Sequence, residues 1–289
     1  TILTNKLVVA KAYTAEINTA SEVVAYSGTV AAASARALLS TVDAATVTTG
    51  FDVTTSVASI VTTSAATPAV AGTTFKLTAS TDNIVGTAGA DIVNSVFTAD
   101  AATGTTIAPG DSFTGGAGVD TLNISVAGAA TTAALATLSA VSLSGVEKLH
   151  LSNFETSTND HTVDTALMTG LTHVGLASSS ATGDVGFTNL KNLVEADMMN
   201  GSGDVSVTYA TSVVAGTADT QTLNLANASA GTFTAAGVET VAINTSLLAS
   251  TIDAVTATAM SKMTVAGNQN LSIAKALDFA GTGTINGTV

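Results

Sequence analysis

The sequence predicts a mainly β fold made of stacked β-solenoid or β-roll-like coils, with a short helical segment at its N-terminal end. Three observations support this: the composition, a lead-in that recurs along the chain, and a glycine-rich segment that occurs twice. The 289 residues are 46% hydrophobic but only 4% aromatic, with no Trp. Because Thr, Ser, Val and Gly are abundant, short strands joined by tight turns are favoured over long helices.

Residues 1–50 differ from the rest of the chain and are predicted to form a helical connector or cap. Apolar residues such as Leu7 and Tyr13 recur there with helical spacing, and residues 31–39 are an Ala-rich run. We expect two to four short helices in this segment. Residues 51–74 have the composition of a linker.

Beyond the linker, we expect a glycine-rich, calcium-binding β region at residues 75–135 and a repetitive β-solenoid at residues 136–289. Short apolar strands recur behind a similar lead-in, with starts roughly 17 to 30 residues apart, as expected when each repeat is one coil of a stack. The candidate rungs of the stack begin at Gly145, Gly170, Leu190, Thr220, Gly237 and Met260. β-Sandwich domains are the alternative architecture, but the near absence of Asn-Gly hairpin dipeptides favours the solenoid.

The charge and the missing cysteines exclude several classes of function. Charged residues make up 10% of the chain and are mostly acidic, giving a formal net charge of −13 and a pI near 4.2. Nucleic-acid binding is therefore not expected. The absence of cysteine excludes disulfides, thiolate zinc sites and a cysteine nucleophile. No stretch approaches the ~20 apolar residues of a spanning helix, so we expect no membrane insertion.

The most specific signal is the segment that occurs twice. Residues 82–94 align without a gap onto residues 111–123, and the two aspartates within each copy are nine residues apart. Nine residues is the period of the calcium-binding nonapeptide G-G-x-G-x-D-x-U-x, in which a glycine-rich turn precedes a short strand. The copies are 29 residues apart, from Asp82 to Asp111, which can place them on adjacent coils.

Calcium prefers cages of about six to eight oxygen ligands. Glycines allow a turn with φ > 0 that exposes carbonyl oxygens, and the aspartate adds a charged oxygen. The second copy matches the nonapeptide fully, whereas the first has Thr87 in place of its second glycine. The candidate metal-site residues are Asp82, Gly86, Gly89, Asp91, Asp111, Gly115, Gly116, Gly118 and Asp120. Asp184, Asp204 and Asp219 follow incomplete versions of this turn and are weaker candidates, with an ordinary Asp turn as the alternative.

Catalysis is not expected. The chain has three histidines and neither an H-E-x-x-H nor a G-x-S-x-G pattern. We place His150 and His173 on strand surfaces and His161 in a solvated loop, with membership of an ion site as the alternative for His161. Glu147 and Glu239, which both follow a Gly-Val pair, are assigned to equivalent places on separate coils. Paired catalytic carboxylates would have to lie within ~5 to 10 Å of each other.

The doubled motif, the Thr-, Ala- and Val-rich texture and the Gly-Val-Glu lead-ins of this acidic, cysteine-free chain resemble the RTX-like, type I secreted surface-layer (S-layer) proteins of the Caulobacter type. The resemblance covers residues 75–289. It implies an extracellular location at the cell surface, bound Ca2+, self-assembly into a two-dimensional lattice, and attachment to surface polysaccharide through an upstream domain. Because the chain starts at Thr1 without a secretory leader, we expect it to be part of a longer protein. The alternative is the non-catalytic solenoid part of a secreted RTX-type adhesin or enzyme.

Overall fold

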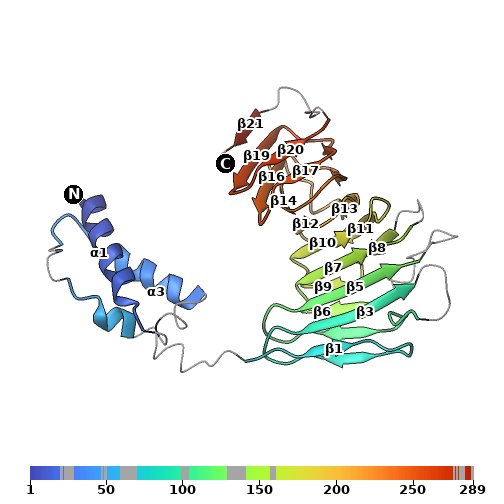
Figure 1. Cartoon of the computed structure of the whole chain (residues 1–289), viewed down its shortest axis with the longest axis horizontal. Coiled ribbons are helices and arrows are strands. Elements are labelled where there is room, and N and C mark those ends of the chain that lie inside the picture. The colour runs from blue at the N-terminus through green and yellow to red at the C-terminus, as the bar shows by residue number, and fades with distance from the viewer. Residues whose placement is uncertain are drawn as a thin grey trace. The chain divides into compact units, whose positions relative to one another are not determined.

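The structure is a computed structural model in which the chain divides into two compact units, Thr1–Ala69 and Val70–Val289. It describes residues 1–19, 22, 29–46, 48, 51–58, 70–98, 104–128, 141–156, 161–275, 277, 279 and 284–287. Helices form the first unit and strands form the second (Figure 1). Of the expected linker, residues 59–69 lie outside the described residues.

The first unit contains helix α1 (Ile2–Glu16) and helix α3 (Thr29–Ser40). Its small core is built from residues that are spread along the unit: Val9, Tyr13, Val42, Val53 and Val57. The Asn5 side-chain amide donates hydrogen bonds to the carbonyl oxygens of Asp43, at 2.9 Å, and Thr46, at 3.2 Å. The segment that follows α3 is therefore fixed against α1.

The second unit is a parallel β-solenoid, as the sequence predicts. Its largest sheet, sheet A, has ten strands, and each pairs in parallel with a strand one coil away in the chain. In spatial order its strands are β1 (Thr74–Lys76), β3 (Ile92–Thr98), β5 (Thr121–Ala127), β7 (Lys148–Asn153), β10 (His173–Ser179), β12 (Glu195–Met199), β14 (Thr220–Ala226), β16 (Thr240–Ser246), β19 (Lys262–Gly267) and β21 (Thr284–Gly287). Since β-sandwiches are built from antiparallel sheets, the all-parallel pairing excludes that alternative.

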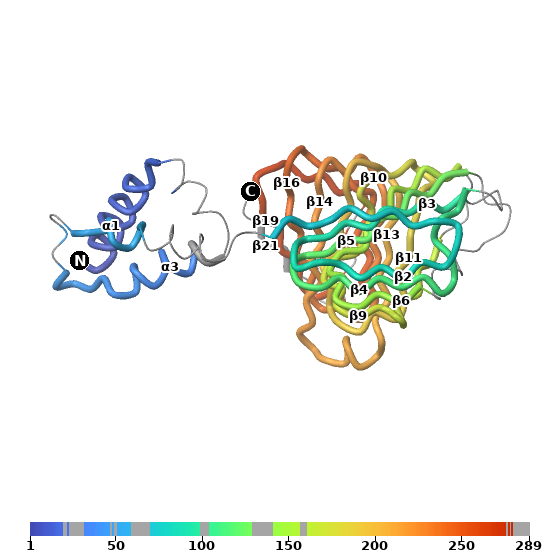
Figure 2. The backbone as a smooth tube through the Cα atoms, turned by 90° about the horizontal axis from the view of Figure 1, so that it is seen from below, coloured from blue at the N-terminus to red at the C-terminus, as the bar shows by residue number. Residues whose placement is uncertain are grey.

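Three smaller parallel sheets complete the coils. Sheet B contains β2 (Asn83–Val85), β4 (Ser112–Thr114), β6 (Ser142–Ser144) and β9 (Met168–Thr169). Sheet C contains β8 (His161–Asp164), β11 (Val185–Leu190), β13 (Val205–Tyr209), β15 (Thr232–Ala235) and β18 (Ala254–Thr256), and sheet D contains β17 (Ser250–Ile252) and β20 (Leu271–Ile273). Seen from below, successive coils overlie one another, with sheet A along one side and sheet B along another (Figure 2).

Five of the six predicted rungs become strands of sheet A, whereas the segment that begins at Leu190 ends β11 of sheet C and forms the turn before β12. The lead-ins precede or enter β7, β10, β12, β14, β16 and β19, which are consecutive neighbours in the sheet. Coil length varies. Residues paired in register on neighbouring strands of sheet A are separated by 18 positions at Thr74 and Ile92 and by 29 positions at Ile92 and Thr121. A recurring lead-in therefore located the rungs where a fixed period could not.

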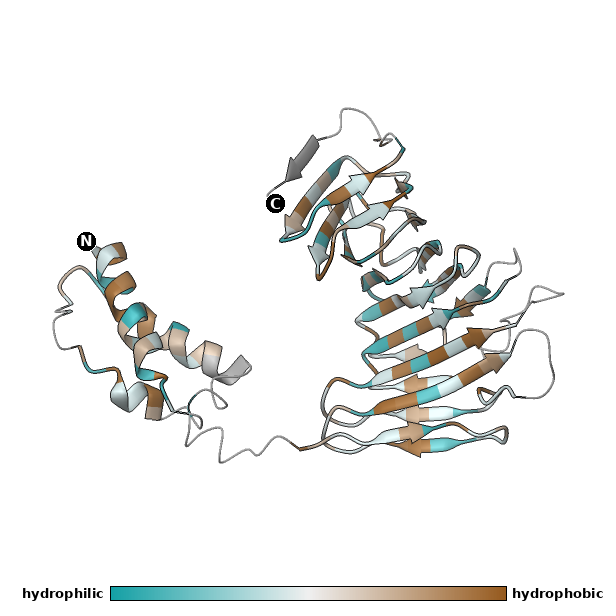
Figure 3. Ribbon diagram, viewed as in Figure 1, coloured by the Kyte–Doolittle hydropathy of each residue, from teal (hydrophilic) through white to brown (hydrophobic). Residues whose placement is uncertain are grey.

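Alternating side chains explain why these segments fold as rungs. In sheet A, Leu122, Leu149 and Val174 stand in one register column and are at most 1% exposed. The neighbouring positions face outward, so along β5 the buried residues Leu122, Ile124 and Val126 alternate with polar ones (Figure 3). Because each coil covers the apolar face of the next, small aliphatic side chains suffice to fill the interior.

Polar side chains form a ladder on the outer face of sheet A. The Asn123 amide donates to Asn94 Oδ1 at 3.2 Å, and the Asn244 amide donates to Asn224 Oδ1 at the same distance. All four residues belong to one register column of the sheet. Stacked amides thus add side-chain hydrogen bonds along the direction in which the coils stack.

Candidate metal centre

The two copies of the glycine-rich motif lie on adjacent coils. Asn83 pairs with Ser112 in sheet B, and Ile92 pairs with Thr121 in sheet A. The copies are therefore stacked in register over two successive strands, as expected from the sequence.

The nine candidate residues lie at two different corners of the coil. Asp82 and Asp111 directly precede β2 and β4, where the chain enters sheet B. The other seven lie at the next corner, between sheet B and sheet A, which we call the glycine-rich corner: Gly86, Gly89, Asp91, Gly115, Gly116, Gly118 and Asp120. The short strands β2 and β4 separate the two groups, so the structure brings together seven of the nine residues.

The turns of the glycine-rich corner are in direct backbone contact. A Cβ atom on Gly115 would lie 1.9 Å from the carbonyl oxygen of Gly145 on the next coil. A Cβ atom on Gly116 would lie 2.1 Å from the carbonyl oxygen of Thr87 on the previous coil, and Gly116 has a φ of +112°. Only glycine fits such positions. Close packing of the backbone therefore explains why these two positions are glycine, whether or not a metal binds.

Both carboxylate oxygens of Asp91 are already hydrogen-bonded. Asp91 Oδ1 accepts the N–H of Thr73 at 2.6 Å, and Oδ2 accepts the N–H of Thr87 at 2.5 Å. The Thr87 hydroxyl lies 3.0 and 3.2 Å from the two oxygens. The Thr87 N–H is the main cause that lowers the pKa of Asp91, helped by the Thr73 N–H and the Thr87 hydroxyl and opposed by burial.

Asp120 occupies the equivalent position on the next coil, but only one of its two carboxylate oxygens is hydrogen-bonded. Its Oδ1 accepts the Asp91 N–H at 2.7 Å. Its Oδ2 is buried and has no hydrogen-bond partner among the described residues, and the whole residue is 0% exposed. Gly116 stands where the first copy has Thr87, so no hydroxyl is present to cover this oxygen. A buried carboxylate oxygen without a donor is unfavourable, and a hard cation such as Ca2+ is the ligand that would suit it.

Asp82 and Asp111 are held by backbone donors at their own corner. Asp111 Oδ1 accepts the Asp82 N–H at 2.8 Å, and its Oδ2 accepts the Ala108 N–H at 2.7 Å. Asp82 Oδ2 accepts the Thr78 N–H at 2.7 Å. These two aspartates therefore connect coils and close turns, and the corner at Asp120 fits a cation better.

Glu147 is a residue that the nonapeptide motif did not identify as part of this corner. Its Oε2 accepts the Asp120 N–H at 2.8 Å, and its own N–H donates to the Asp120 carbonyl oxygen at 3.1 Å. Asp120 and Glu147 thus bond reciprocally across two coils. The only sequence signal for this was the Gly-Val-Glu lead-in, which repeats at Glu239. The assignment of both glutamates to equivalent places agrees with the structure, because Glu239 Oε2 accepts the Asp219 N–H at 2.9 Å.

The weaker candidates Asp184 and Asp204 lie at the entry to sheet C. Asp184 Oδ1 accepts the Asp204 N–H at 2.6 Å, and Asp204 Oδ1 accepts the Thr232 N–H at 2.7 Å. A shallow hollow of about 260 Å³ lies beside them on the outer face of sheet C, lined by hydroxyls such as that of Ser206. Like the other corners, this one uses aspartates to bond successive coils.

The histidines are all paired with carboxylates. His150 Nε2 lies 2.8 Å from Asp197 Oδ2, and His173 Nε2 lies 3.3 Å from Glu195 Oε2, both on the outer face of sheet A as expected. The expectation of a solvated loop for His161 was wrong. This residue is 1% exposed, because it begins β8 with its side chain turned inward.

His161 contacts the buried carboxylate of Glu155 and packs edge-on against Phe97, with ring centroids 6.2 Å apart. Within the described residues, no three or more His, Asp or Glu side chains gather into a preformed metal cage. A cation at Asp120 would therefore take most of its other ligands from backbone carbonyls, hydroxyls and water. No helix within the described ranges is long and apolar enough to cross a membrane.

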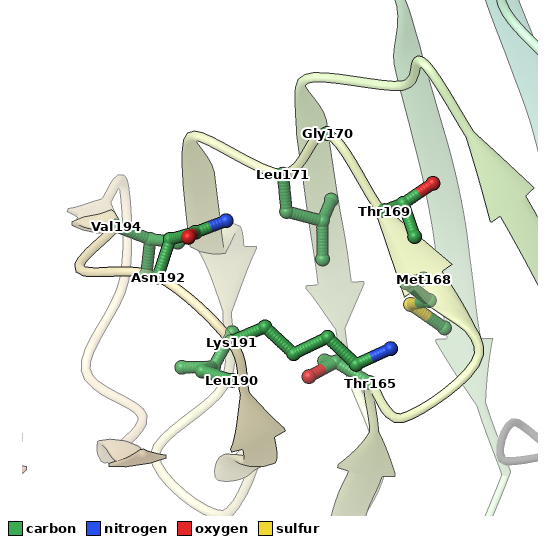
Figure 4. A pocket seen from close by; sticks show the side chains of 9 residues that line it. All are labelled: Thr165, Met168, Thr169, Gly170, Leu171, Leu190, Lys191, Asn192 and Val194. Carbon is green, nitrogen blue, oxygen red and sulfur yellow. The ribbon is translucent and has the colours of Figure 1, made fainter. Parts of the chain in front are cut away.

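A second hollow of about 80 Å³ lies between the coils at Thr165, Met168 and Leu190. Figure 4 shows Lys191 extending from its own coil toward Thr165 and Met168. The Lys191 ammonium donates to the Ala166 carbonyl oxygen at 2.6 Å. The hollow has room for a few water molecules but not for an organic substrate, since ligand pockets are usually about 300–1,000 Å³.

No family model, curated protein or solved structure matches the chain. The fold defines its class: a parallel β-solenoid whose coils are joined at the corners by carboxylates that accept backbone N–H groups.

Proposed function

We propose that this chain is a structural, non-catalytic subunit of a calcium-dependent bacterial surface layer, which assembles into a two-dimensional lattice on the cell exterior. The observation that best supports calcium is the buried Asp120 Oδ2, which has no partner within the described residues, at the corner that matches the nonapeptide fully. The sequence resemblance supplies the cellular setting. Attachment to surface polysaccharide through an upstream region is part of the same proposal.

Calcium would act on the solenoid by neutralising charge between coils. Asp91, Asp120 and Glu147 lie on three successive coils and are linked in series by N–H donors. Such stacked carboxylates repel one another at close range. At calcium concentrations 100 times the dissociation constant, one ion would stabilise the fold by about 2.7 kcal/mol.

The net charge gives calcium a second role in assembly. A charge of −13 opposes close approach of identical subunits. Calcium at ~10⁻⁴ to 10⁻³ M, the range of extracellular modules, would neutralise carboxylates within the fold and at subunit contacts. Monovalent salt screens this repulsion but provides no multidentate bridge. Assembly would therefore occur outside the cell and be prevented inside it.

The test compares purified protein at matched ionic strength, in sodium alone and with millimolar calcium, by light scattering and electron microscopy. We expect a two-dimensional lattice in calcium alone, and equal assembly in both samples contradicts a specific calcium role. Dispersed particles in both samples would favour the solenoid of a secreted RTX-type adhesin or enzyme. Asp120→Ala should weaken calcium binding in calorimetry more than Asp184→Ala does.

A further inference from the structure

Two buried carboxylate oxygens stand out in the described part of the chain. Asp120 Oδ2 and Asp219 Oδ2 are each shielded from solvent and have no hydrogen-bond partner there. Asp120 belongs to the nonapeptide, but Asp219 follows Gly216-Thr-Ala, which lacks that pattern. Leaving such an oxygen without a donor costs free energy unless a ligand satisfies it.

The two aspartates have the same backbone surroundings. The Asp219 N–H donates to Glu239 Oε2 at 2.9 Å, and the N–H groups of Glu239 and Thr240 donate to the Asp219 carbonyl oxygen at 3.2 and 3.0 Å. At the first corner, the Asp120 N–H donates to Glu147 Oε2 at 2.8 Å, and the Glu147 and Lys148 N–H groups donate to the Asp120 carbonyl oxygen at 3.1 and 3.0 Å. The same three hydrogen bonds between the aspartate and the next coil therefore occur at both corners.

A glycine also lies beside each of the two carboxylates. A Cβ atom on Gly115 would lie 2.2 Å from Asp120 Oδ2, and a Cβ atom on Gly216 would lie 3.1 Å from both oxygens of Asp219. The absence of a side chain lets each carboxylate lie against the backbone of its own turn, which carries carbonyl oxygens. Such a turn combines the ligand types that Ca2+ prefers.

No basic side chain neutralises the second pair. Within the described residues, neither Asp219 nor Glu239 forms an ion pair with a lysine or an arginine. Asp219 and Glu239 lie on adjacent coils, so their two carboxylates repel each other. A divalent cation bound between them would remove the repulsion and satisfy the free oxygen together.

We propose that Asp219 and Glu239 hold a second divalent cation, of the oxygen-preferring calcium class, at a corner that the nonapeptide motif does not mark. By the same geometry, Glu147 belongs to the site of Asp120. The proposal extends the calcium binding proposed above from one corner to two, because both contain an aspartate with a free buried oxygen and a Gly-Val-Glu glutamate on the next coil.

The test is the stoichiometry of Ca2+ binding to the chelator-treated full chain, by calorimetry and equilibrium dialysis. We expect Asp219→Asn and Glu239→Gln each to remove one bound ion while the ion at Asp120 remains. Asp204→Asn is the matched control, since this exposed turn aspartate accepts the Thr232 N–H and should leave the stoichiometry unchanged. Unchanged stoichiometry in both corner variants overturns the second site but leaves the first intact, whereas absence of any binding to the wild type overturns both.

Thermal melting separates a ligand role from a purely structural one. In excess chelator, Asp219→Asn removes a carboxylate charge that repels Glu239, so the variant should melt at the same temperature as the wild type or higher. In millimolar calcium the order should reverse, because only the wild type gains the ion. A variant that melts lower by the same amount in both conditions shows that Asp219 serves the fold alone, and the proposal fails.

Discussion

The imidazole of His150 bonds to the carboxylate of Asp197 across an entire intervening coil, with Nε2 2.8 Å from Oδ2. The residue between them in the register column of sheet A is Gly175. Because glycine has no side chain, the two groups meet over its backbone. The Asn224 amide then donates to Asp197 Oδ1 at 2.8 Å, so the network continues on the next coil.

Gly175→Ala should destabilise the solenoid. A Cβ atom at this position would lie 2.1 Å from the carbonyl oxygen of Asp197, so the backbone of one coil must move. We expect a loss of about 1–3 kcal/mol in the free energy of unfolding, measured by urea denaturation.

Gly186→Ala is the matched control for that substitution. It also replaces a strand glycine, but the one close contact of its Cβ would be with the Ser206 hydroxyl, at 2.9 Å, and the next atoms lie at 3.7 Å and beyond. This hydroxyl can rotate away, so we expect a much smaller loss than at Gly175. Equal losses at the two positions would show that the contact with the Asp197 backbone is not the cause.

Tyr209 should ionise only at strongly alkaline pH. Burial raises its pKa to about 12, against a small opposing effect of the Val194 N–H. Its hydroxyl donates to Gln221 Oε1, and the Gln221 amide donates to the Val194 carbonyl oxygen at 3.0 Å. Since the pKa is raised in the folded state, the stability from neutral Tyr209 is complete below pH 10 and is lost as the pH rises toward 12.

The difference of two pKa units corresponds to about 3 kcal/mol. An alkaline titration followed by tyrosinate absorbance should therefore show a late step that coincides with unfolding. Tyr209→Phe should abolish that step and, by leaving Gln221 Oε1 without its donor, cost about 1–3 kcal/mol at neutral pH. If the late step persists in the variant, it belongs to another tyrosine.

Local pattern was sufficient to locate the rungs but not the contacts between coils. Alternating apolar residues after Gly145 and Gly237 identified β7 and β16, because a strand buried on one face needs that alternation. The partnership of Asp120 with Glu147 spans 27 residues and that of Asp219 with Glu239 spans 20. With coil lengths this variable, no fixed spacing indicates which carboxylate meets which N–H.

The sequence did not predict the burial of His161, for a different reason. Its position between Asp160 and Asp164 has the composition of a solvated loop. Sheet C begins at this residue, and its first side chain points inward against Phe97. The start of an additional sheet depends on how the coil closes, which a single short segment does not reveal.

Asp91 should contribute to loss of stability in acid. Its pKa is lowered in the folded state, chiefly by the Thr87 N–H. The stability that it provides is therefore complete above its ordinary pKa and is lost as the pH falls through the lowered value. We expect Asp91→Asn to flatten the acid side of the curve of unfolding free energy against pH.

Thr87→Val tests the assigned cause of that shift. It removes the hydroxyl that lies 3.0 Å from Asp91 Oδ1 but keeps the N–H that bonds Oδ2. Because the N–H is the larger cause, this variant should keep most of the acid dependence. A curve as flat as that of Asp91→Asn would show that the hydroxyl dominates instead.

Leu247 occupies a backbone position that other coils give to asparagine. Asn200, Asn227 and Leu247 follow residues that are paired in register across β12, β14 and β16, and their φ angles are +49°, +59° and +62°. The Asn227 amide donates to Asn200 Oδ1 at 3.2 Å. Asparagine tolerates this left-handed conformation, whereas leucine does not. The Leu247 side chain is also 71% exposed, so packing provides little compensation.

Leu247→Asn should therefore stabilise the protein by about 0.5–1 kcal/mol, because it relieves the strained backbone and lets a third amide join the ladder of Asn200 and Asn227. The measurement is the urea midpoint at neutral pH. Leu248→Asn is the matched control: this neighbour is 58% exposed but does not have a positive φ, so removing an exposed leucine there should change the stability little. A gain of equal size at both positions would mean that lost apolar exposure, and not the left-handed backbone of Leu247, explains the effect.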